Sequence, residues 1–117
     1  MLPVELSRQI TQQQADITLL ADPSLFWFKG HFPQLPLLPG VAQLDWALRY
    51  GIELLAPGWQ FSAVENIKFQ QPILPGKTLR LSLTWNVGKQ WLTFSYQILD
   101  DDAVRTASSG KIKLCRQ

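Results

Sequence analysis

The chain has 117 residues, a formal net charge of +2 at pH 7 and 46% hydrophobic residues, as expected for one domain over residues 1–117. The charge is too small to predict nucleic-acid binding, and we expect neither a membrane span nor a leader, since no apolar run reaches about 20 residues. The single cysteine, Cys115, excludes an internal disulfide and a cysteine-based zinc site, so we expect a cytoplasmic protein without a bound metal.

The first part of the chain holds one predicted strand. Residues 1–13 are polar, and we expect them to form an irregular N-terminal segment. Residues 15–21 then alternate apolar and polar side chains, with Ile17 and Leu19 on the same side, which is typical of a half-buried strand.

Residues 39–55 are predicted to form a helix. Pro39 suits the first turn, because a helix makes no use of the missing N–H there, and a Pro-Gly pair ends the segment. Apolar residues cover more than one side, so the helix should be buried nearly all round. Its polar residues Asp45, Arg49 and Glu53 are spaced by four and form one narrow stripe.

The rest of the chain is predicted to be antiparallel sheet, with Ile67 and Phe69 facing inward and Lys68 outward on its first strand. The four strands are expected at residues 63–70, 79–85, 91–99 and 103–114. With one strand before the helix, this order indicates an α+β fold in which the sheet wraps around a central helix. Because one small sheet covers so apolar a helix poorly, we expect a homodimer that pairs edge strands.

The segment of residues 30–45 holds the candidate catalytic side chains. Its histidine, His31, is the only one in the chain and lies among prolines that fix the backbone ahead of the predicted helix. Asp45 lies about one turn inside that helix. Because imidazole titrates near neutral pH, this pairing of a histidine with an acid predicts a site for proton transfer.

The motif Gly30-His31-Phe32-Pro33, Pro36, Pro39-Gly40-Val41 and Asp45 resembles the 3-hydroxyacyl-[acyl-carrier-protein] dehydratases of the FabA/FabZ type. A second stretch, from Ile67 to Leu81, resembles the strand–turn–strand unit that follows the helix in that family. Residues 39–47 and the chain length are also similar to the smaller ApeI-like branch, which is associated with aryl polyene lipid synthesis.

This resemblance implies a dimeric hotdog fold and dehydration of a (3R)-3-hydroxyacyl carrier-protein thioester to the trans-2-enoyl product, in fatty acid or aryl polyene biosynthesis. It places the catalytic histidine at His31 and the catalytic acid at Asp45, with the two facing each other from different subunits. It places the backbone N–H that binds the thioester oxygen at Gly40, with Val41 beside it.

The resemblance also implies the partner. The substrate is carried on the phosphopantetheine arm of an acyl carrier protein, so no further cofactor is expected. The acidic surface of such a carrier would meet basic side chains. The candidate contacts are Lys68, Lys77, Arg80, Lys111 and Lys113.

Arg49 departs from the family pattern, because the two main branches usually carry glutamine four residues after the acid. A cation paired with Asp45 favours the ionised carboxylate, which is a poorer proton donor. Arg49 therefore keeps open a non-catalytic dimer that binds the acyl carrier. Two further alternatives also stay open, a hotdog acyl thioesterase and, from the Asp45 branch of the family, isomerisation of the enoyl product.

Overall fold

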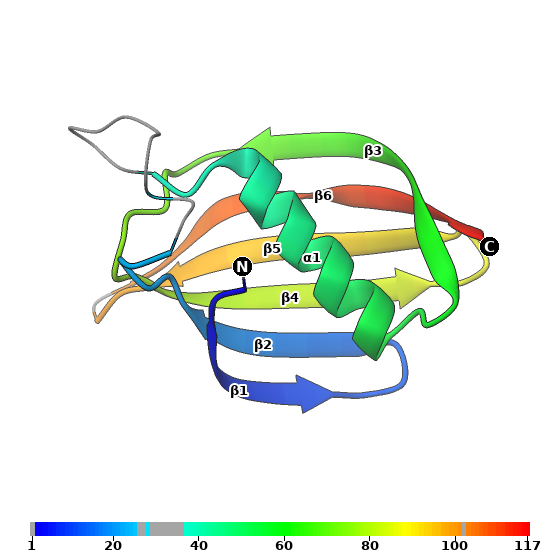
Figure 1. The fold of residues 1–117 in the computed structure, drawn as a ribbon, viewed down its shortest axis with the longest axis horizontal. Helices are drawn as coiled ribbons and strands as arrows, with labels where there is room; N and C mark the ends of the chain where they lie inside the picture. The colour runs from blue at the N-terminus through cyan, green and yellow to red at the C-terminus, as the bar shows by residue number, and fades with distance from the viewer. Residues whose placement is uncertain (1, 26–27, 29–36, 102) are drawn as a thin grey trace.

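The structure is a computed structural model that describes residues 2–25, 28, 37–101 and 103–117. Within these ranges the chain forms one helix that lies across one face of an antiparallel sheet (Figure 1). The elements are β1 (Val4–Ile10), β2 (Gln14–Leu20), α1 (Gly40–Leu54), β3 (Trp59–Phe69), β4 (Thr78–Asn86), β5 (Trp91–Leu99) and β6 (Val104–Arg116).

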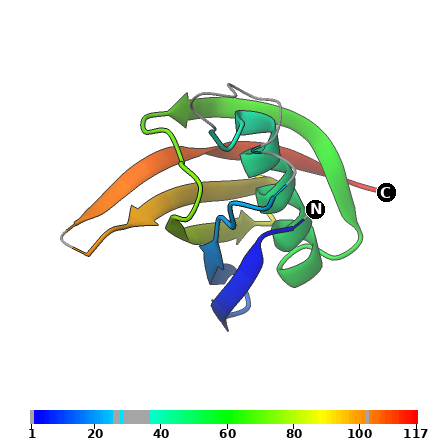
Figure 2. The same ribbon diagram turned by 60° about the vertical axis from the view of Figure 1, so that its left-hand side comes forward.

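The sheet has the strand order β1-β2-β4-β5-β6-β3, and all of its neighbouring strands are antiparallel. The chain leaves α1, enters β3 at one edge beside β6, and then crosses to β4 near the middle. Figure 2 shows the sheet curling around the helix. This is the hotdog arrangement that the sequence predicted.

One side of α1 forms the centre of the core. Its buried side chains include Ala42, Trp46, Ala47 and Tyr50. Gly51 allows the helix to approach the sheet closely, because a methyl group there would collide with the side chain of Leu92 on β5. Alternate residues of β2, β4 and β5 point at this side of the helix and are buried, including Ile17, Leu81 and Phe94.

The N-terminal segment corrects the sequence prediction. Residues 4–10, expected to be irregular, form β1, which pairs with β2 from Val4 opposite Leu20 to Ile10 opposite Ala15. Every residue of β1 is exposed, so backbone hydrogen bonds hold the strand rather than side-chain burial. An alternation was present in the sequence, since Val4, Leu6 and Ile10 stand at even positions among polar residues, but these apolar side chains are exposed and lie outside the core.

The predicted helix and all five predicted strands are confirmed. Their first and last residues differ from the predicted ones by up to four residues. One expectation of burial was wrong. Phe69 was expected to face inward but is 55% exposed, because β3 is an edge strand whose register shifts between Glu65 and Lys68. The helix was expected to be covered nearly all round with the help of a second copy, and within one chain Val41 on its outer side is 62% exposed.

No helix in the described ranges is both long enough and apolar enough to cross a membrane.

Candidate active site

Asp45 lies in the second turn of α1 with its side chain 31% exposed. The guanidinium of Arg49, one turn further along, donates from Nε to Oδ1 at 3.1 Å and to Oδ2 at 3.0 Å. The ion pair considered from the sequence therefore forms. Since Arg49 is 63% exposed, solvent screens the pair, and such pairs contribute about 0.5 kcal/mol or less.

An apolar groove of about 240 Å³ runs beside Asp45, between the outer side of α1 and the sheet. The groove is lined by Val41, Leu44, Asp45, Leu48, Phe61, Val64 and Ile112. Val41 and Asp45 share one face of the helix because they are four residues apart. The acid thus projects beside a surface suited to a hydrocarbon chain.

The start of α1 has no side-chain cap. The carbonyl of Pro39 accepts hydrogen bonds from the N–H groups of Ala42, at 3.1 Å, and Gln43, at 3.2 Å. No acceptor for the N–H of Gly40 or Val41 is found among the described residues. Free N–H groups at the positive end of a helix dipole stabilise negative charge placed near them.

A pocket of about 440 Å³ lies at this end of the helix. Its lining includes Leu38, Gly40, Gln43 and Phe69. The ring of Phe69 lies so close to Gly40 that an added Cβ would be 2.6 Å from Cζ. Glycine therefore allows the close approach of this ring, which would have to move aside for any side chain at position 40, and Gly40 itself lines the pocket.

A known family matches almost the entire chain. The ApeI-like family model, described as ApeI dehydratase, covers residues 7–111. The chain belongs to the ApeI-like dehydratase family.

Two solved structures are similar to this family member over nearly their whole length. A protein from Erwinia carotovora subsp. atroseptica, described as uncharacterized, has 62% identity and a TM-score of 0.92, covering 99% of this chain and 98% of its own. A chain of the dehydratase heterocomplex ApeI:P from Xenorhabdus doucetiae has 55% identity and a TM-score of 0.91, covering 99% of this chain and all of its own.

The 3-hydroxyacyl-[acyl-carrier-protein] dehydratase FabZ of Fusobacterium nucleatum subsp. nucleatum is 34% identical over 83 residues, which are 67% of this chain and 56% of FabZ. The chain thus spans about half the length of the curated relatives that it matches. The match supports the FabA/FabZ resemblance of the motif.

Only part of the predicted site of this ApeI-like chain lies in the described residues. Asp45, Gly40 and Val41 lie together on the first two turns of α1, and Gly40 and Asp45 are about 7.5 Å apart along the helix axis at 1.5 Å per residue. His31 lies outside the described residues. Its role as the partner of Asp45 stays a prediction.

Sequence reasoning missed Gln43 and the position of Phe69 against the helix start. Gln43 is 4% exposed, and its side chain bonds to Leu38 and Ser108. One signal was available, since Gln43 lies off the polar stripe of Asp45 and its neighbours, on the side of the helix predicted to be buried. A polar residue at such a position predicts an internal hydrogen-bond partner.

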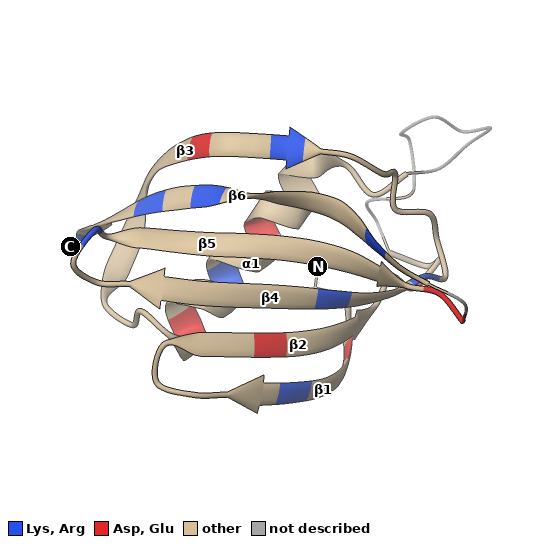
Figure 3. Ribbon diagram, turned by 180° about the vertical axis from the view of Figure 1, so that it is seen from behind, with Lys and Arg blue, Asp and Glu red and all other residues tan. Residues whose placement is uncertain are grey.

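Three of the five basic residues expected to meet an acyl carrier lie on β3 and β6, and each has a different environment. They are Lys68, Lys111 and Lys113. Lys68 lies near the end of β3 and precedes Phe69, which lines the pocket. Lys111 Nζ lies 4.0 Å from the centroid of the Trp91 ring, and Lys113 donates to a backbone carbonyl at 3.3 Å. Figure 3 shows Lys and Arg spread over several strands rather than gathered at one place.

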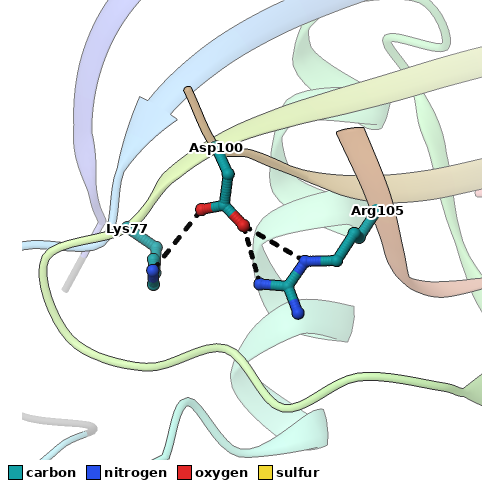
Figure 4. Close-up of polar contacts among 3 residues, drawn as sticks. All are labelled: Lys77, Asp100 and Arg105. Carbon is teal, nitrogen blue, oxygen red and sulfur yellow. Dashed lines mark hydrogen bonds and ion pairs between the residues drawn. The ribbon is translucent and has the colours of Figure 1, made fainter. Parts of the chain in front are cut away.

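The other two basic candidates have partners within the chain. Lys77 Nζ lies 3.4 Å from Oδ1 of Asp100, and Arg105 binds Oδ2 of the same carboxylate at 2.8 Å (Figure 4). Burial acts to raise the pKa of Asp100, but hydrogen bonds from Arg105 and Lys77 outweigh it and the pKa is lowered. Arg80 donates to Gln97 at 3.3 Å. These five residues do not form one continuous basic patch.

In the part of the chain that the structure describes, no group of three or more His, Cys, Asp or Glu side chains is placed to hold a metal ion.

Proposed function

We propose that this protein removes water from a 3-hydroxyacyl thioester carried by an acyl carrier protein, giving the 2-enoyl thioester. The observation that carries the proposal is the position of Asp45. It lies beside an apolar groove and about one and a half turns from an uncapped helix start, in a chain of a dehydratase family. The cytoplasmic location and the absence of a further cofactor stay predictions.

The reaction needs one base, one acid and one site for negative charge. His31 takes the proton from C2 of the substrate, as the family resemblance implies. Asp45 gives a proton to the hydroxyl on C3, which leaves as water while the C2–C3 double bond forms. Charge that develops on the thioester oxygen is stabilised by the Gly40 N–H at the positive end of the helix.

We propose that the groove beside Asp45 holds the acyl chain. Its lining is apolar apart from Asp45 itself, so a hydrocarbon chain lying there would place its polar C3 hydroxyl against the carboxyl group. Burial of each methylene of such a chain contributes about 0.8 kcal/mol. Val41, Phe61 and Val64 in its lining are exposed, so a second chain would have to cover the groove to exclude water.

A second copy of this chain is the proposed cover. Apolar side chains on the outer side of α1 and on β3 are exposed, including Val41 at 62%, Phe61 at 48% and Val64 at 40%. They border the groove, and β3 is an edge strand with free backbone groups along one side. An exposed apolar surface beside an open strand edge favours symmetric pairing of two copies. Each copy would bring its His31 to the Asp45 of the other.

A different chain could also occupy this surface, since the relative from Xenorhabdus doucetiae belongs to a heterocomplex. Light scattering of the purified protein at micromolar concentration separates the two arrangements. A mass of twice 13.3 kDa supports the homodimer, whereas a mass of 13.3 kDa means that the cover is another protein.

A non-catalytic role in binding the acyl carrier is the second candidate function. The ion pair between Asp45 and Arg49 favours it, because both oxygens of the carboxylate already accept from Arg49 Nε and are less free to contact a substrate hydroxyl. In this role the groove would hold the acyl chain without altering it. The other residues of the site do not distinguish the two roles.

Mass spectrometry of a 3-hydroxyacyl carrier protein incubated with the wild type, Asp45→Asn and His31→Ala tests the proposal. Loss of water with the wild type alone establishes the dehydratase and both catalytic residues. Loss of the acyl group indicates a thioesterase. An unchanged substrate that still binds the protein supports the non-catalytic role.

For the carrier, Lys68 is the proposed contact among the five candidates, because it is the residue before Phe69, which lines the pocket at the helix start. Lys68→Glu should raise KM for the acyl carrier substrate about tenfold by reversing an interface charge. It should leave the rate with a short, uncharged thioester analogue unchanged. Arg80→Glu, on β4, is the matched control with a smaller expected effect.

A further inference from the structure

Gln43 is the one polar side chain of α1 that is buried. It lies among Ala42, Trp46 and Ala47 on the side of the helix that faces the sheet. A buried amide loses its hydration, and its internal hydrogen bonds do little more than offset that loss. An apolar side chain of similar length would fill the same space, so what the amide adds is a fixed geometry.

The sheet holds Gln43 at its side chain and at its backbone. Ser108 Oγ donates to Oε1 of Gln43 at 2.6 Å, and the hydroxyl of Tyr96 donates to the Gln43 carbonyl at 2.7 Å. Ser108 on β6 and Tyr96 on β5 are directly opposite each other in the sheet, and neither has any exposed surface. The position of Gln43 relative to the sheet is therefore fixed at two points.

Gln43 also fixes the backbone of the residues that lead into the helix. Its Nε2 donates to the carbonyl of Leu38 at 3.1 Å, and the N–H of Leu38 donates to the Ile73 carbonyl at 2.9 Å. The side chain of Leu38 is buried. Both backbone polar groups of the residue two positions before Gly40 are thus held, and Pro39 between them has a restricted φ.

The opposite wall of the pocket is held by the same part of β6. The N–H groups of Gln70 and Gln71 donate to the carbonyl of Ala107 at 2.8 and 3.1 Å. Ala107 is the neighbour of Ser108, which bonds to Gln43. Residues on both walls of the pocket at the helix start are therefore anchored at two adjacent residues of one buried strand.

We propose that Gln43 and Ser108 are positioning residues that hold the backbone of residues 38–40, so that the Gly40 N–H meets the thioester oxygen in the transition state. This inference rests on the proposed dehydratase function. Neither side chain touches the reacting atoms in this account. They act through Leu38, which Gln43 binds directly, and so set where the helix start lies relative to Phe69 and the rest of the pocket.

Such a role predicts a particular kinetic signature. The negative charge on the thioester oxygen develops only in the transition state, so a displaced N–H weakens catalysis more than substrate binding. We expect kcat to fall about tenfold or more, with KM within about threefold of the wild type. A residue that only supports the fold would instead lower the melting temperature and leave kcat of the folded enzyme unchanged.

The test measures kcat, KM and the melting temperature for the wild type, Ser108→Ala and Gln43→Met, with a 3-hydroxyacyl carrier protein as substrate. Ser109→Ala is the matched control, because Ser109 is the next residue on β6 and lies outside the pocket lining. Ile17→Val is the control for stability, since it opens a small space in the core on β2. If Gln43→Met does not fold, the kinetics of Ser108→Ala alone test the proposal.

A tenfold or larger loss of kcat in Ser108→Ala, with KM and both controls near the wild type, supports the positioning role. A kcat within about threefold of the wild type, or a loss carried by KM alone, overturns it. A wild type that releases no water refutes the proposed function itself, which is a separate outcome from either of these.

Discussion

The two sides of α1 differ in how far the chain itself covers them. The inner side is packed against the sheet, and in the described part of the chain no buried side-chain nitrogen or oxygen lacks a hydrogen-bond partner. Even the amide of Gln43 is satisfied at both ends. The outer side instead exposes Val41 and, across the groove, Phe61 and Val64 on the edge strand.

The residues that stabilise the fold therefore lie on one side of α1, and the residues proposed for function lie on the other. The inner side holds the sheet and the start of α1 in place without help from another molecule. The outer side carries Asp45 and the groove, and we propose that a second chain covers it. The proposed catalytic acid thus lies on the exposed side of the helix, while the start of the helix is held from the buried side.

The largest expected effect is the loss of the acid on the outer side. Asp45→Asn should lower kcat by about 100-fold or more, because the amide cannot donate a proton to the leaving hydroxyl. Glu53→Gln is the control, since Glu53 lies on the same stripe two turns further along. Steady-state kinetics of both variants check this, and an active Asp45→Asn enzyme would contradict the assigned role.

A charge on the edge strand should break the proposed pairing. Val64→Asp places a carboxylate where two copies would meet, and its desolvation should raise the dissociation constant of the dimer about 100-fold or more. Light scattering should then report a mass near 13.3 kDa. Val87→Asp, in the turn between β4 and β5, is also exposed and should leave the mass unchanged. If Val64→Asp and Val87→Asp had the same mass, the contact between two copies would lie away from Val64.

A smaller effect is expected on the inner side from Tyr96→Phe. This variant leaves the Gln43 carbonyl without the hydroxyl donor, which should lower the free energy of unfolding by about 1 to 2 kcal/mol at neutral pH. Burial, reinforced by nearby Tyr50 and Asp45, raises the pKa of Tyr96 well above its ordinary 10.0. A hydrogen bond from the Ala47 backbone opposes this rise.

The raised pKa of Tyr96 also predicts how stability depends on pH. Above pH 10 the unfolded chain releases the Tyr96 proton while the folded chain retains it, so unfolding becomes easier as pH rises through that range. The contribution of Tyr96 is complete below pH 10 and is lost above it. Urea titrations between pH 8 and about 11 should show a shallower loss in Tyr96→Phe than in the wild type. If the free energy of unfolding fell equally with pH in Tyr96→Phe and in the wild type, Tyr96 would not be the source of this pH dependence.

The smallest effect is expected from Arg49→Gln. The pair with Asp45 is exposed, so its removal should change the free energy of unfolding by about 0.5 kcal/mol or less. We expect kcat within about threefold of the wild type, since solvent already screens the guanidinium. A rise in kcat of about tenfold or more would show that Arg49 restrains the acid in the wild type.

The residues explain which features could be predicted from the sequence. Asp45, Gly40 and Val41 were found because they belong to a spaced motif, and their places on the first two turns of α1 follow directly from helix geometry. The strands β4 and β5 were found because their side chains alternate between the core and the solvent.

Other features depend on the tertiary fold. β1 was missed although Val4, Leu6 and Ile10 stand at alternate positions, because these side chains are exposed and the pairing to β2 places the strand in the sheet. Phe69 was placed inward because its strand alternates, whereas the strand order puts β3 at the sheet edge. The partners of Lys77 and Lys111 also follow from strand pairing and not from local sequence.

A mixing experiment tests most directly the claim that the outer side is completed by a second copy. His31→Ala and Asp45→Asn should each be inactive alone, and equal amounts of the two should be unfolded together and refolded. If the histidine and the acid come from different subunits, each mixed dimer keeps one intact site, and the sample should regain about a quarter of wild-type activity. A mixture as inactive as its components would show that each site is built within one chain, and would contradict this account.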